Sequence, residues 1–336
     1  MNDEAIHPTF DHVADAAERL RDVAVRTPLL EAPLLNDLVG GRVLVKAEVL
    51  QRTGSFKFRG AYNRVSRTTQ EERTRGVLCF SSGNHAQGVA AAAQLFKTRA
   101  YIVMPATAPA LKVARCKAMG AEVILHDGDR RSMEQRTEAL AKEKGLVLVR
   151  PFDDRFVIAG QGTVGLEIAA QLAERQTFAD LVLVPCSGGG LVAGIALALE
   201  RQSPATAVYS AEPAGFDDMA CSLAAGTRVA NAPGRSSICD ALQVPEPGAI
   251  TFAVNKPRLR GGLVVNDDEV RRAMAIAFEH LKIVVEPGGA VGLAAILAGR
   301  VDVRGRTVVV VASGGNVDPA VFRSAIGERD HRSSVA

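Results

Sequence analysis

Residues 181–200 have the sequence LVLVPCSGGGLVAGIALALE, which contains a strand pattern, a glycine-rich turn and a helix pattern in that order. The run Leu181–Val184 is continuous and apolar, as expected of a fully buried strand. The segment Gly190–Glu200 has the length and composition of a helix. A buried strand that leads through glycines into a helix is typical of a parallel sheet covered by helices on both faces. This stretch therefore predicts an α/β fold.

The same alternation of apolar strands and helix-length segments continues from about Arg42 to the end of the chain. The strand candidates besides Leu181–Val184 are Val43–Lys46, Val77–Phe80, Ala100–Met104, Glu122–Leu125, Leu146–Val149, Ala207–Ala211 and Thr307–Ala312. The helix candidates besides Gly190–Glu200 are Ala86–Phe96, Ala110–Met119 and Met133–Lys144. Gly120 and Gly145 directly follow two of these helices, where a C-cap glycine is expected.

The composition is that of an ordinary globular protein, with 336 residues, 47% hydrophobic residues and 23% charged residues. The formal net charge of +3 comes from 40 basic and 37 acidic residues spread along the chain. A nucleic-acid-binding protein would gather its basic residues on one face and supply aromatic groups for stacking. Because aromatic residues make up only 4% and Trp is absent, we expect no nucleic-acid partner.

The cysteines and the N-terminus suggest a reducing, cytoplasmic setting. The five cysteines are scattered at positions 79, 116, 186, 221 and 239 and form no C-x-x-C pair, so neither a disulfide framework nor a structural zinc site is expected. The chain opens with Asn2, Asp3 and Glu4 rather than with a basic stretch followed by an apolar one, which argues against a signal peptide. Gly, Pro or charged residues interrupt the apolar stretches before about 20 residues, so we expect no membrane span.

The chain has no internal repeat, and its domain boundary is only weakly marked. The candidates are the polar stretch Arg67–Arg75 and the segment Pro151–Arg155. The segment Asn231–Pro257 is rich in Pro and Gly and is interpreted as irregular. The polar residues from Glu328 to Ala336 are expected to be frayed.

Three glycine-rich turns each follow an apolar strand. They are Ser81-Ser82-Gly83-Asn84-His85, Ser187-Gly188-Gly189-Gly190-Leu191 and Ser313-Gly314-Gly315-Asn316. Ligands of open α/β sheets bind at the carboxyl ends of the strands, and consecutive glycines there let backbone N–H groups approach an anion. One such turn could be a tight turn without a ligand, but three in one chain favour a ligand.

The segment Gly160–Gly165, GQGTVG, matches the spacing of the dinucleotide-binding fingerprint. A true fingerprint follows a full strand and has an acidic residue after the next strand. Here only the short run Val157–Ala159 precedes it, and Asp180 lies before the next strand. We therefore do not expect a nicotinamide enzyme.

Lys57 lies between two phenylalanines in the stretch Ser55–Gly60, SFKFRG. Lysines are ordinarily solvated surface groups, but these neighbours suggest an apolar setting. Burial lowers the pKa of a lysine amine and makes it a nucleophile that can react with an aldehyde. Together with turns suited to a phosphate, this predicts a phosphorylated aldehyde, and pyridoxal phosphate is the common one.

The motifs SFKFRGAYN at 55–63, SSGNHAQG at 81–88, SGGGL at 187–191, AEP at 211–213 and SGGN at 313–316 resemble the serine/threonine dehydratase and serine racemase family. The resemblance runs from about Thr27 to Asn316. It implies a fold type II pyridoxal-phosphate enzyme, like the tryptophan synthase β chain, with two open, mostly parallel sheets and the cofactor between two domains. We expect a large domain of residues 1–69 and 154–330, a small domain of residues 70–153, and a tail of residues 331–336.

By this resemblance, Lys57 holds the cofactor aldehyde and removes the α-proton of the substrate. The remaining cofactor contacts are expected from Phe56 against the ring, Asn84 at the 3-hydroxyl, the backbone of Ser187, Gly188, Gly189, Gly190 and Leu191 at the phosphate, Glu286 in a turn lining the pocket, and Ser313 at the ring nitrogen. Family members often have a fourth glycine where this chain has Ser187. Because the expected contacts are backbone N–H groups, that change should be tolerated.

The resemblance also implies substrate contacts. Ser81, Asn84 and His85 would bind the α-carboxylate at the N-terminal end of the following helix. Ser82 matches the residue that acts on the face opposite the lysine in racemases of the family, and a plain turn serine is the alternative. Phe152 is a further candidate for a contact with the substrate side chain.

Glu212 and Asp218, with the carbonyl of Phe216, match a divalent-cation site of the family. Oxygen ligands of this kind suit Mg²⁺ or Ca²⁺. An acidic surface loop is the alternative, because carboxylates at this spacing also occur without ions.

The predicted function is a dehydratase that releases water and ammonia from a small 3-hydroxy amino acid. The substrates considered are serine, threonine, 3-hydroxyaspartate and phenylserine. Arg130 or Arg131 could pair with a second carboxylate, although solvated arginines are the alternative. Ala241 replaces a glycine of the relatives at the pocket floor. An amino-acid racemase and a non-catalytic cofactor carrier are the other hypotheses, and we expect a homodimer by analogy with the family.

Overall fold

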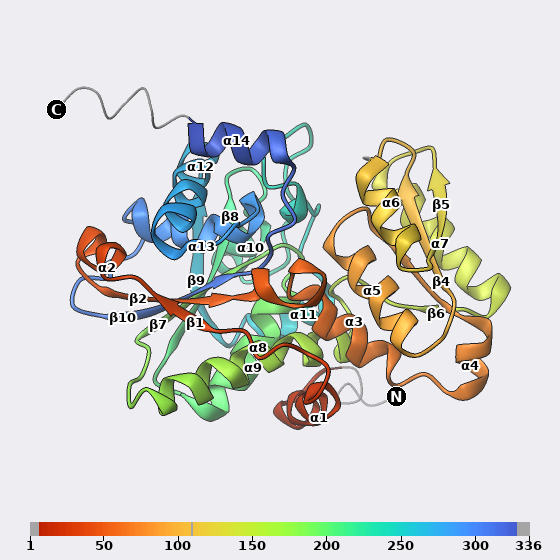
Figure 1. The fold of residues 1–336 in the computed structure, drawn as a ribbon, viewed down its shortest axis with the longest axis horizontal. Helices are drawn as coiled ribbons and strands as arrows, with labels where there is room; N and C mark the ends of the chain where they lie inside the picture. The colour runs from red at the N-terminus through yellow and green to blue at the C-terminus, as the bar shows by residue number, and fades with distance from the viewer. Residues whose placement is uncertain (1–6, 109, 328–336) are drawn as a thin grey trace.

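The computed structural model describes residues 7–108 and 110–327, and it has the predicted α/β architecture with two sheets (Figure 1). The larger sheet has six strands in the order β1-β2-β10-β7-β8-β9. Only β1 runs antiparallel to its neighbour. The bounds are β1 (Leu29–Glu31), β2 (Arg42–Ala47), β10 (Thr307–Ala312), β7 (Leu181–Pro185), β8 (Ala207–Pro213) and β9 (Leu259–Val265).

The smaller sheet has four parallel strands in the order β5-β4-β3-β6. The bounds are β5 (Glu122–His126), β4 (Ala100–Pro105), β3 (Val77–Phe80) and β6 (Val147–Leu148). All four strands lie within the predicted small domain of residues 70–153, and all six strands of the larger sheet lie outside it. The division into these two domains, with its boundaries, stays a prediction.

Helices cover both faces of each sheet. The helices are α1 (Phe10–Leu20), α2 (Pro33–Val39), α3 (Lys57–Val65), α4 (Gln70–Arg75), α5 (Asn84–Leu95), α6 (Ala110–Ala118), α7 (Arg130–Lys144), α8 (Arg155–Glu174), α9 (Gly190–Gln202), α10 (Asp218–Ala225), α11 (Ala249–Asn255), α12 (Asp267–Ile276), α13 (Pro287–Leu297) and α14 (Pro319–Gly327). Figure 1 shows the smaller sheet with α4–α7 on one side of the molecule and the larger sheet with α8–α14 on the other.

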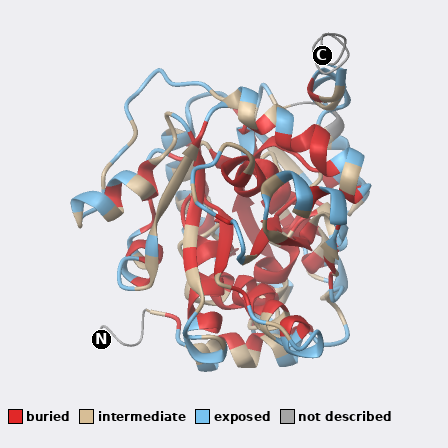
Figure 2. Ribbon diagram, turned by 90° about the vertical axis from the view of Figure 1, so that its left-hand side faces the viewer, coloured by how far each residue is buried: buried red, intermediate tan, exposed pale blue. Residues whose placement is uncertain are grey.

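The alternation of side chains along β10 explains why its sequence is apolar throughout. Val308 and Val310 pack into a core that includes α13, whereas Val309 and Val311 pack into a core that includes α8 and α9. A strand buried on both faces requires an apolar residue at every position. Figure 2 shows the resulting buried interior, with exposed segments at the periphery.

Several expectations need correction. The run Val157–Ala159 is helical, because it lies in α8, and the segment Gly160–Gly165 forms the middle of that helix. The segment Asn231–Pro257 is not irregular throughout, since it contains a 3₁₀ turn at Asp240–Leu242 and helix α11. The strands β1 and β9 were not among the predicted elements.

The glycines of α8 serve helix packing instead of nucleotide binding. A Cβ atom at Gly162 would lie 2.8 Å from the carbonyl oxygen of Gly194 in α9, and one at Gly165 would lie 2.8 Å from the Cβ of Ala198. Only residues without side chains let the two helix backbones approach this closely. By length and composition α8 could cross a membrane, but 67% of its most apolar window is buried inside the fold, as in the core helix of a globular protein.

Two predicted terminal features lie outside the described residues. They are the opening residues Asn2, Asp3 and Glu4 and the polar tail from Glu328 to Ala336. Of the two predicted C-cap glycines, Gly145 is confirmed, because it directly follows α7 with a φ of 60°. Gly120 also has a positive φ, of 82°, but Met119 separates it from the end of α6 at Ala118.

Candidate active site

A cavity of about 390 Å³ lies where the two sheets meet. Its lining includes the turn after β3, the turn after β7 and residues after β10, which are the three glycine-rich turns of the sequence. Lys57 and Phe56 complete this wall. The carboxyl ends of strands from both sheets therefore open onto one cavity, as expected for a ligand site of an open α/β sheet.

Lys57 is the first residue of α3 and lies partly buried in the cavity wall. Its Nζ donates a hydrogen bond to the carbonyl of Pro151 (2.7 Å) and lies 5.2 Å from the centre of the Phe56 ring. Burial and then the charge of Arg130 lower the pKa of Lys57 to about 8, against an opposing effect of Glu286. About a tenth of the amine is therefore uncharged and nucleophilic at pH 7, far more than for an ordinary lysine.

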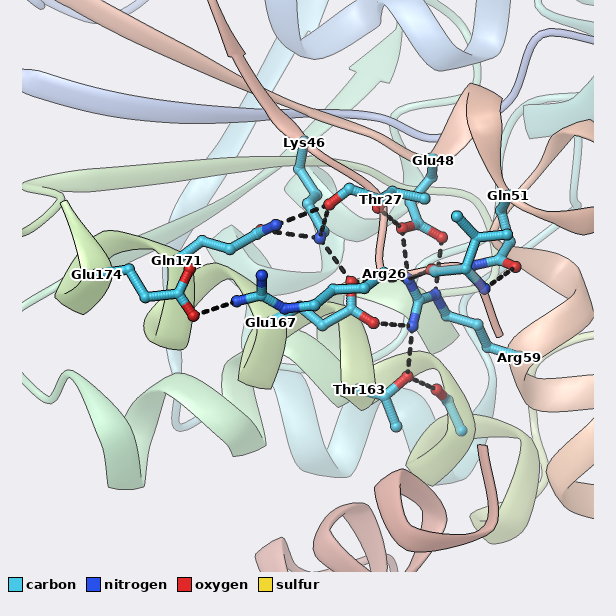
Figure 3. Close-up of polar contacts among 12 residues, drawn as sticks. Arg26, Thr27, Lys46, Glu48, Gln51, Arg59, Thr163, Glu167, Gln171 and Glu174 are labelled. Atoms are coloured by element: carbon cyan, nitrogen blue, oxygen red, sulfur yellow. Dashed lines mark hydrogen bonds and ion pairs between the residues drawn. The ribbon is translucent and has the colours of Figure 1, made fainter. Parts of the chain in front are cut away.

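A buried network of charged residues holds α3 in place (Figure 3). Arg59 is fully buried and bonds to Glu48 of the turn after β2 (2.8 Å) and to Glu167 of α8 (2.6 Å). Lys46 of β2 bonds to the same Glu167 (2.6 Å). Burial alone would raise the pKa of Glu48, but the charge and hydrogen bonds of Arg59 hold it below its usual value. The network thus joins the lysine helix to β2 and α8.

This buried network was not among the features predicted from the sequence. Arg59 belongs to the quoted motif at 55–63, and a charged residue two positions after the reactive lysine was the available signal. Its partners, Glu48 and Glu167, lie 11 and 108 residues away along the chain. Pairings over such separations are not visible in a single sequence.

Asn84 and Glu286 meet at one wall of the cavity. The Asn84 side-chain amide donates to Glu286 Oε1 (2.6 Å) and accepts from the amide of Asn316 (2.8 Å). Burial, and then the charge of Asp240, raise the pKa of Glu286 to about 7. Asn316 stands in the quoted SGGN motif but had no predicted role. The structure makes it the support of Asn84.

The turn Ser81–His85 leads into the N-terminus of α5 and lines the cavity. The Ser81 hydroxyl accepts from the backbone N–H of Gly83 (3.1 Å). His85 is buried, with Nε2 2.8 Å from the carbonyl of Val149, and burial lowers its pKa to about 3. Neutral His85 must donate from Nε2 to that carbonyl, so Nδ1 is the acceptor and is buried without a partner among the described residues.

The turn Ser187–Leu191 forms the N-terminus of α9 and another part of the cavity wall. Gly189 has a φ of 93°, which glycine adopts without strain. A Cβ atom at Gly188 would lie 2.3 Å from the ring of Phe152. Phe152 therefore packs directly on the glycine turn and also borders the cavity, while its predicted contact with a substrate stays a prediction.

Ser313 follows β10, is buried and lines the cavity. Ala241 also lines the cavity but is exposed. Of the two candidate arginines, Arg130 lines the cavity and Arg131 does not. Within residues 7–108 and 110–327, Arg130 makes no hydrogen bond or ion pair, although the charge of Glu134 acts on it. Its guanidinium is therefore available to a ligand in the cavity.

The predicted metal ligands lie outside the lining of this cavity. Glu212 accepts hydrogen bonds from the backbone N–H groups of Met219 and Ala220, both at 2.9 Å, and so supports the first turn of α10. Asp218 accepts from Asn231 through Oδ1 (2.7 Å), while its Oδ2 is buried without a partner in the described part of the chain. The described residues contain no group of three or more His, Cys, Asp or Glu side chains placed to hold a metal ion.

One cavity thus brings together a reactive lysine and the N-termini of two helices, one of which begins with a glycine turn. This combination is typical of enzymes that bind a phosphorylated aldehyde through a lysine. The family model of pyridoxal-phosphate dependent enzymes matches residues 20–314, and the chain belongs to this family. The residues present fit the cofactor: Lys57 has a lowered pKa, and the Gly188 and Gly189 positions leave no room for a Cβ.

Relatives with known activities align over nearly the whole chain. An L-threonine ammonia-lyase of Thermotoga maritima is 40% identical over 92% of this chain and 76% of its own length. An L-threo-3-hydroxyaspartate ammonia-lyase of Saccharomyces cerevisiae is 39% identical over 98% of this chain and 100% of its own length. The solved structure of maize serine racemase has a TM-score of 0.89 at 36% identity, covering 97% of this chain and 99% of the other. The predicted family and fold class are thereby confirmed.

Proposed function

We propose that this chain is a pyridoxal-phosphate-dependent ammonia-lyase that converts a small 3-hydroxy amino acid into a 2-oxo acid and ammonia. The observation that carries the proposal is Lys57, whose pKa is about 8, in a cavity shared by two helix N-termini. The relatives named above include lyases for threonine and for L-threo-3-hydroxyaspartate. Ammonia release from these substrates by the purified, cofactor-loaded protein tests the proposal, and no release from any of them would contradict it.

Each part of the cavity has a role in this reaction. Bound pyridoxal phosphate withdraws electrons from the substrate Cα. The uncharged Nζ of Lys57 removes the α-proton, and the 3-hydroxyl group leaves with a proton as water. The helix N-terminus at Ser81–His85 holds the α-carboxylate, since the first N–H groups of a helix have no internal partners. The unsaturated amine that is released then reacts with one water molecule and gives the 2-oxo acid and ammonium.

Ser313 supports elimination as the main outcome. It lines the cavity, and the family resemblance implies that a residue at this position faces the cofactor's ring nitrogen. A hydroxyl group does not force that nitrogen to stay protonated, whereas a carboxylate would. Electron withdrawal by the ring is then milder, which suits a reaction in which a leaving group takes the electrons promptly.

Arg130 favours a substrate with a second carboxylate, such as 3-hydroxyaspartate. It lines the cavity without a hydrogen bond or ion pair to another described residue, and it is close enough to Lys57 to lower the pKa of that amine. A guanidinium binds a carboxylate through two parallel hydrogen bonds. Two of the relatives, at 39% identity each, are L-threo-3-hydroxyaspartate ammonia-lyases.

The Arg130→Ala variant tests this preference against Arg131→Ala, which changes a neighbour outside the cavity. We expect Arg130→Ala to raise KM for L-threo-3-hydroxyaspartate at least tenfold, because it removes a charge-assisted pair. The KM for threonine should change less. Equal effects of the two variants would contradict a role for Arg130 in substrate choice.

Racemisation is the second candidate function, and Ser82 is the observation that favours it. Ser82 lines the cavity, and its hydroxyl makes no hydrogen bond to another described residue, so it is free to carry a proton to the substrate. Chiral analysis of recovered serine or aspartate tests this function, and Ser82→Ala should abolish any racemisation while elimination continues. Cofactor absorbance without turnover of any kind would instead support a carrier role.

A divalent cation is also proposed at Glu212, Asp218 and the carbonyl of Phe216. The buried, unpartnered Oδ2 of Asp218 supports it, because Mg²⁺ and Ca²⁺ prefer oxygen ligands. Added Mg²⁺ should raise the melting temperature of the wild type but not that of Asp218→Asn. An equal response of both proteins would contradict the site.

A cytoplasmic homodimer is proposed as well, and sedimentation of the purified protein tests its oligomeric state.

A further inference from the structure

Helix α11 contacts the glycine turn Ser187–Leu191 through two side chains that sequence motifs did not assign. The hydroxyl of Thr251 donates a hydrogen bond to the carbonyl of Gly188 (2.5 Å). The side-chain amide of Asn255 donates to the carbonyl of Gly189 (3.2 Å). The backbone N–H of Gly248, just before α11, also donates to Gly188 (3.2 Å). Two consecutive carbonyls of the turn are thus held by one short helix.

These contacts determine the direction of the N–H groups of the turn. In a planar trans peptide the C=O and N–H bonds point in opposite directions. Holding the carbonyls of Gly188 and Gly189 against α11 therefore turns the N–H groups of Gly189 and Gly190 away from that helix. The N–H of Gly189 faces the sulfur of Cys186, which lines the cavity.

The packing leaves the turn little freedom to reorient. Thr251 and Asn255 are both fully buried. A Cβ atom at Gly189 would lie 3.0 Å from Thr251, 2.9 Å from Asn255 and 2.7 Å from Met219. The Oδ1 of Asn255 is buried without a described partner, which costs stability. An apolar side chain at position 255 would avoid an unpaired buried oxygen, but it would not bond to the Gly189 carbonyl as Asn255 does.

Helix α11 is itself fixed by the segment that carries Pro151, Phe152 and Asp153. The Asp153 carboxylate accepts hydrogen bonds from the N–H groups of Ala249 (3.1 Å), Ile250 (2.9 Å) and Thr251 (3.1 Å). Its neighbour Phe152 packs on Gly188, and the carbonyl of Pro151 accepts from Lys57. Three consecutive residues therefore contact the reactive lysine, the glycine turn and the helix behind that turn.

We propose that Thr251 and Asn255 are positioning residues for the cofactor phosphate, which orient the peptide groups of the glycine turn from outside the cavity. Asp153 holds α11 in place for this task. The inference rests on the family's cofactor being bound at the glycine turn. Because these residues act on the phosphate only, changing them should weaken the binding of a ligand that carries a phosphate and leave the binding of a ligand without one unchanged.

The experiment compares pyridoxal phosphate with pyridoxal, which has the same aldehyde but no phosphate. Cofactor-free wild type, Thr251→Val and Asn255→Leu are titrated with each compound, and the visible absorbance of the lysine-bound compound is followed. We expect each variant to bind pyridoxal phosphate about tenfold more weakly, the effect of one lost hydrogen bond at the turn. Binding of pyridoxal should stay within twofold of the wild type. Thr251→Ser keeps the hydroxyl and should restore the affinity for pyridoxal phosphate.

The control is Asn266→Ala, which removes a helix-capping side chain from α12, away from the cavity. It should lower the melting temperature while leaving the affinity for pyridoxal phosphate unchanged. An equal loss of affinity for both compounds, or unchanged affinity for pyridoxal phosphate in both Thr251→Val and Asn255→Leu, would overturn the inference. If one of these variants does not fold, the other and Thr251→Ser decide. Wild type that binds the cofactor but releases no ammonia would contradict the proposed function and leave this inference intact.

Discussion

At the scale of single residues, the reactivity of the site depends on the charge of Lys57. Its pKa of about 8 results from burial and from the nearby Arg130. The uncharged fraction of the amine therefore grows as the pH rises through 8 rather than through the ordinary lysine range near 10.4.

We predict that the reaction of pyridoxal with the cofactor-free protein speeds up with pH, with a midpoint near pH 8 and a plateau roughly one pH unit higher, because only the uncharged amine attacks the aldehyde. Stopped-flow absorbance at several pH values measures this profile. Arg130→Ala removes a positive charge and should move the midpoint to higher pH. Lys57→Ala should abolish the reaction, and a retained lysine-linked absorbance in that variant would contradict the assignment of Lys57.

A second prediction at this scale concerns Glu48, which is fully buried and bonded to Arg59 through both carboxylate oxygens at 2.8 Å. Glu48→Ala leaves the Arg59 charge without one of its two carboxylate partners, so it should lower the free energy of unfolding by about 3–5 kcal/mol. Glu174→Ala is the control, because its ion pair with Arg26 is exposed, and it should cost at most about 1 kcal/mol. Urea unfolding measures both changes, and similar values would contradict the importance of the buried network.

The same network gives stability a dependence on pH. The pKa of Glu48 lies below its usual value in the folded chain. Its contribution is therefore complete above the unfolded pKa of about 4.3, and it is lost as the pH falls through the folded value. Thermal unfolding between pH 7 and pH 3 should show a steeper loss of stability for the wild type than for Glu48→Gln.

At the scale of elements, the α8 and α9 helices can pack closely because glycines face the contact. Gly162→Ala would place its Cβ 2.8 Å from the Gly194 carbonyl and from two methyl groups of Val13. Overpacking of this kind should cost about 1–3 kcal/mol, measured by urea unfolding. Gly261→Ala in β9 is the matched control, because its nearest neighbour would be 3.8 Å away. Equal stability of the two variants would show that the helices separate easily.

The sequence predicted the elements whose pattern is local. The strands Val77–Phe80 and Thr307–Ala312 were predicted with their observed bounds, because each is continuously apolar and followed by a glycine turn. The strand β9 was missed because its sequence, LRGGLVV, contains two glycines and an arginine. The strand β1 has only three residues, and its pairing with β2 depends on the neighbouring chain.

The residues of the site were likewise predicted where a local motif marks them and missed where none does. Lys57, the three glycine turns and Ser313 were found from motifs and do surround one cavity. The supports Arg59, Thr251 and Asn255 were not found, since each acts on a residue far away in sequence. A side chain that holds another residue in position leaves no spacing pattern of its own.

At the scale of the whole molecule, helix α3 joins the two halves, one built on the smaller sheet and the other on the larger sheet. It begins with Lys57 and packs against α5 of the smaller sheet and α8 of the larger one. The approach is close on both sides: a Cβ at Gly60 would lie 2.4 Å from Gln161, and one at Gly88 would lie 3.1 Å from the Lys57 carbonyl carbon. The reactive amine therefore sits on the element that both halves share.

The surface contact between the halves is different in kind. Lys112 of α6 pairs with Asp240, across the mouth of the cavity, at 2.9 Å. The two side chains are 25% and 64% exposed, so water and salt screen the pair. It should contribute far less than the buried α3 contacts to holding the halves together.

We predict a coupling energy below about 1 kcal/mol between Lys112 and Asp240 in a double-mutant cycle of Lys112→Ala and Asp240→Ala. Urea unfolding of the four proteins measures this energy, and a repeat at 1 M salt should bring it close to zero, since the Debye length is then about 3 Å. A coupling of several kcal/mol that persists in salt would contradict this expectation. It would mean that the pair is a closed, desolvated contact and that the two halves are held at the mouth of the cavity as firmly as they are at α3.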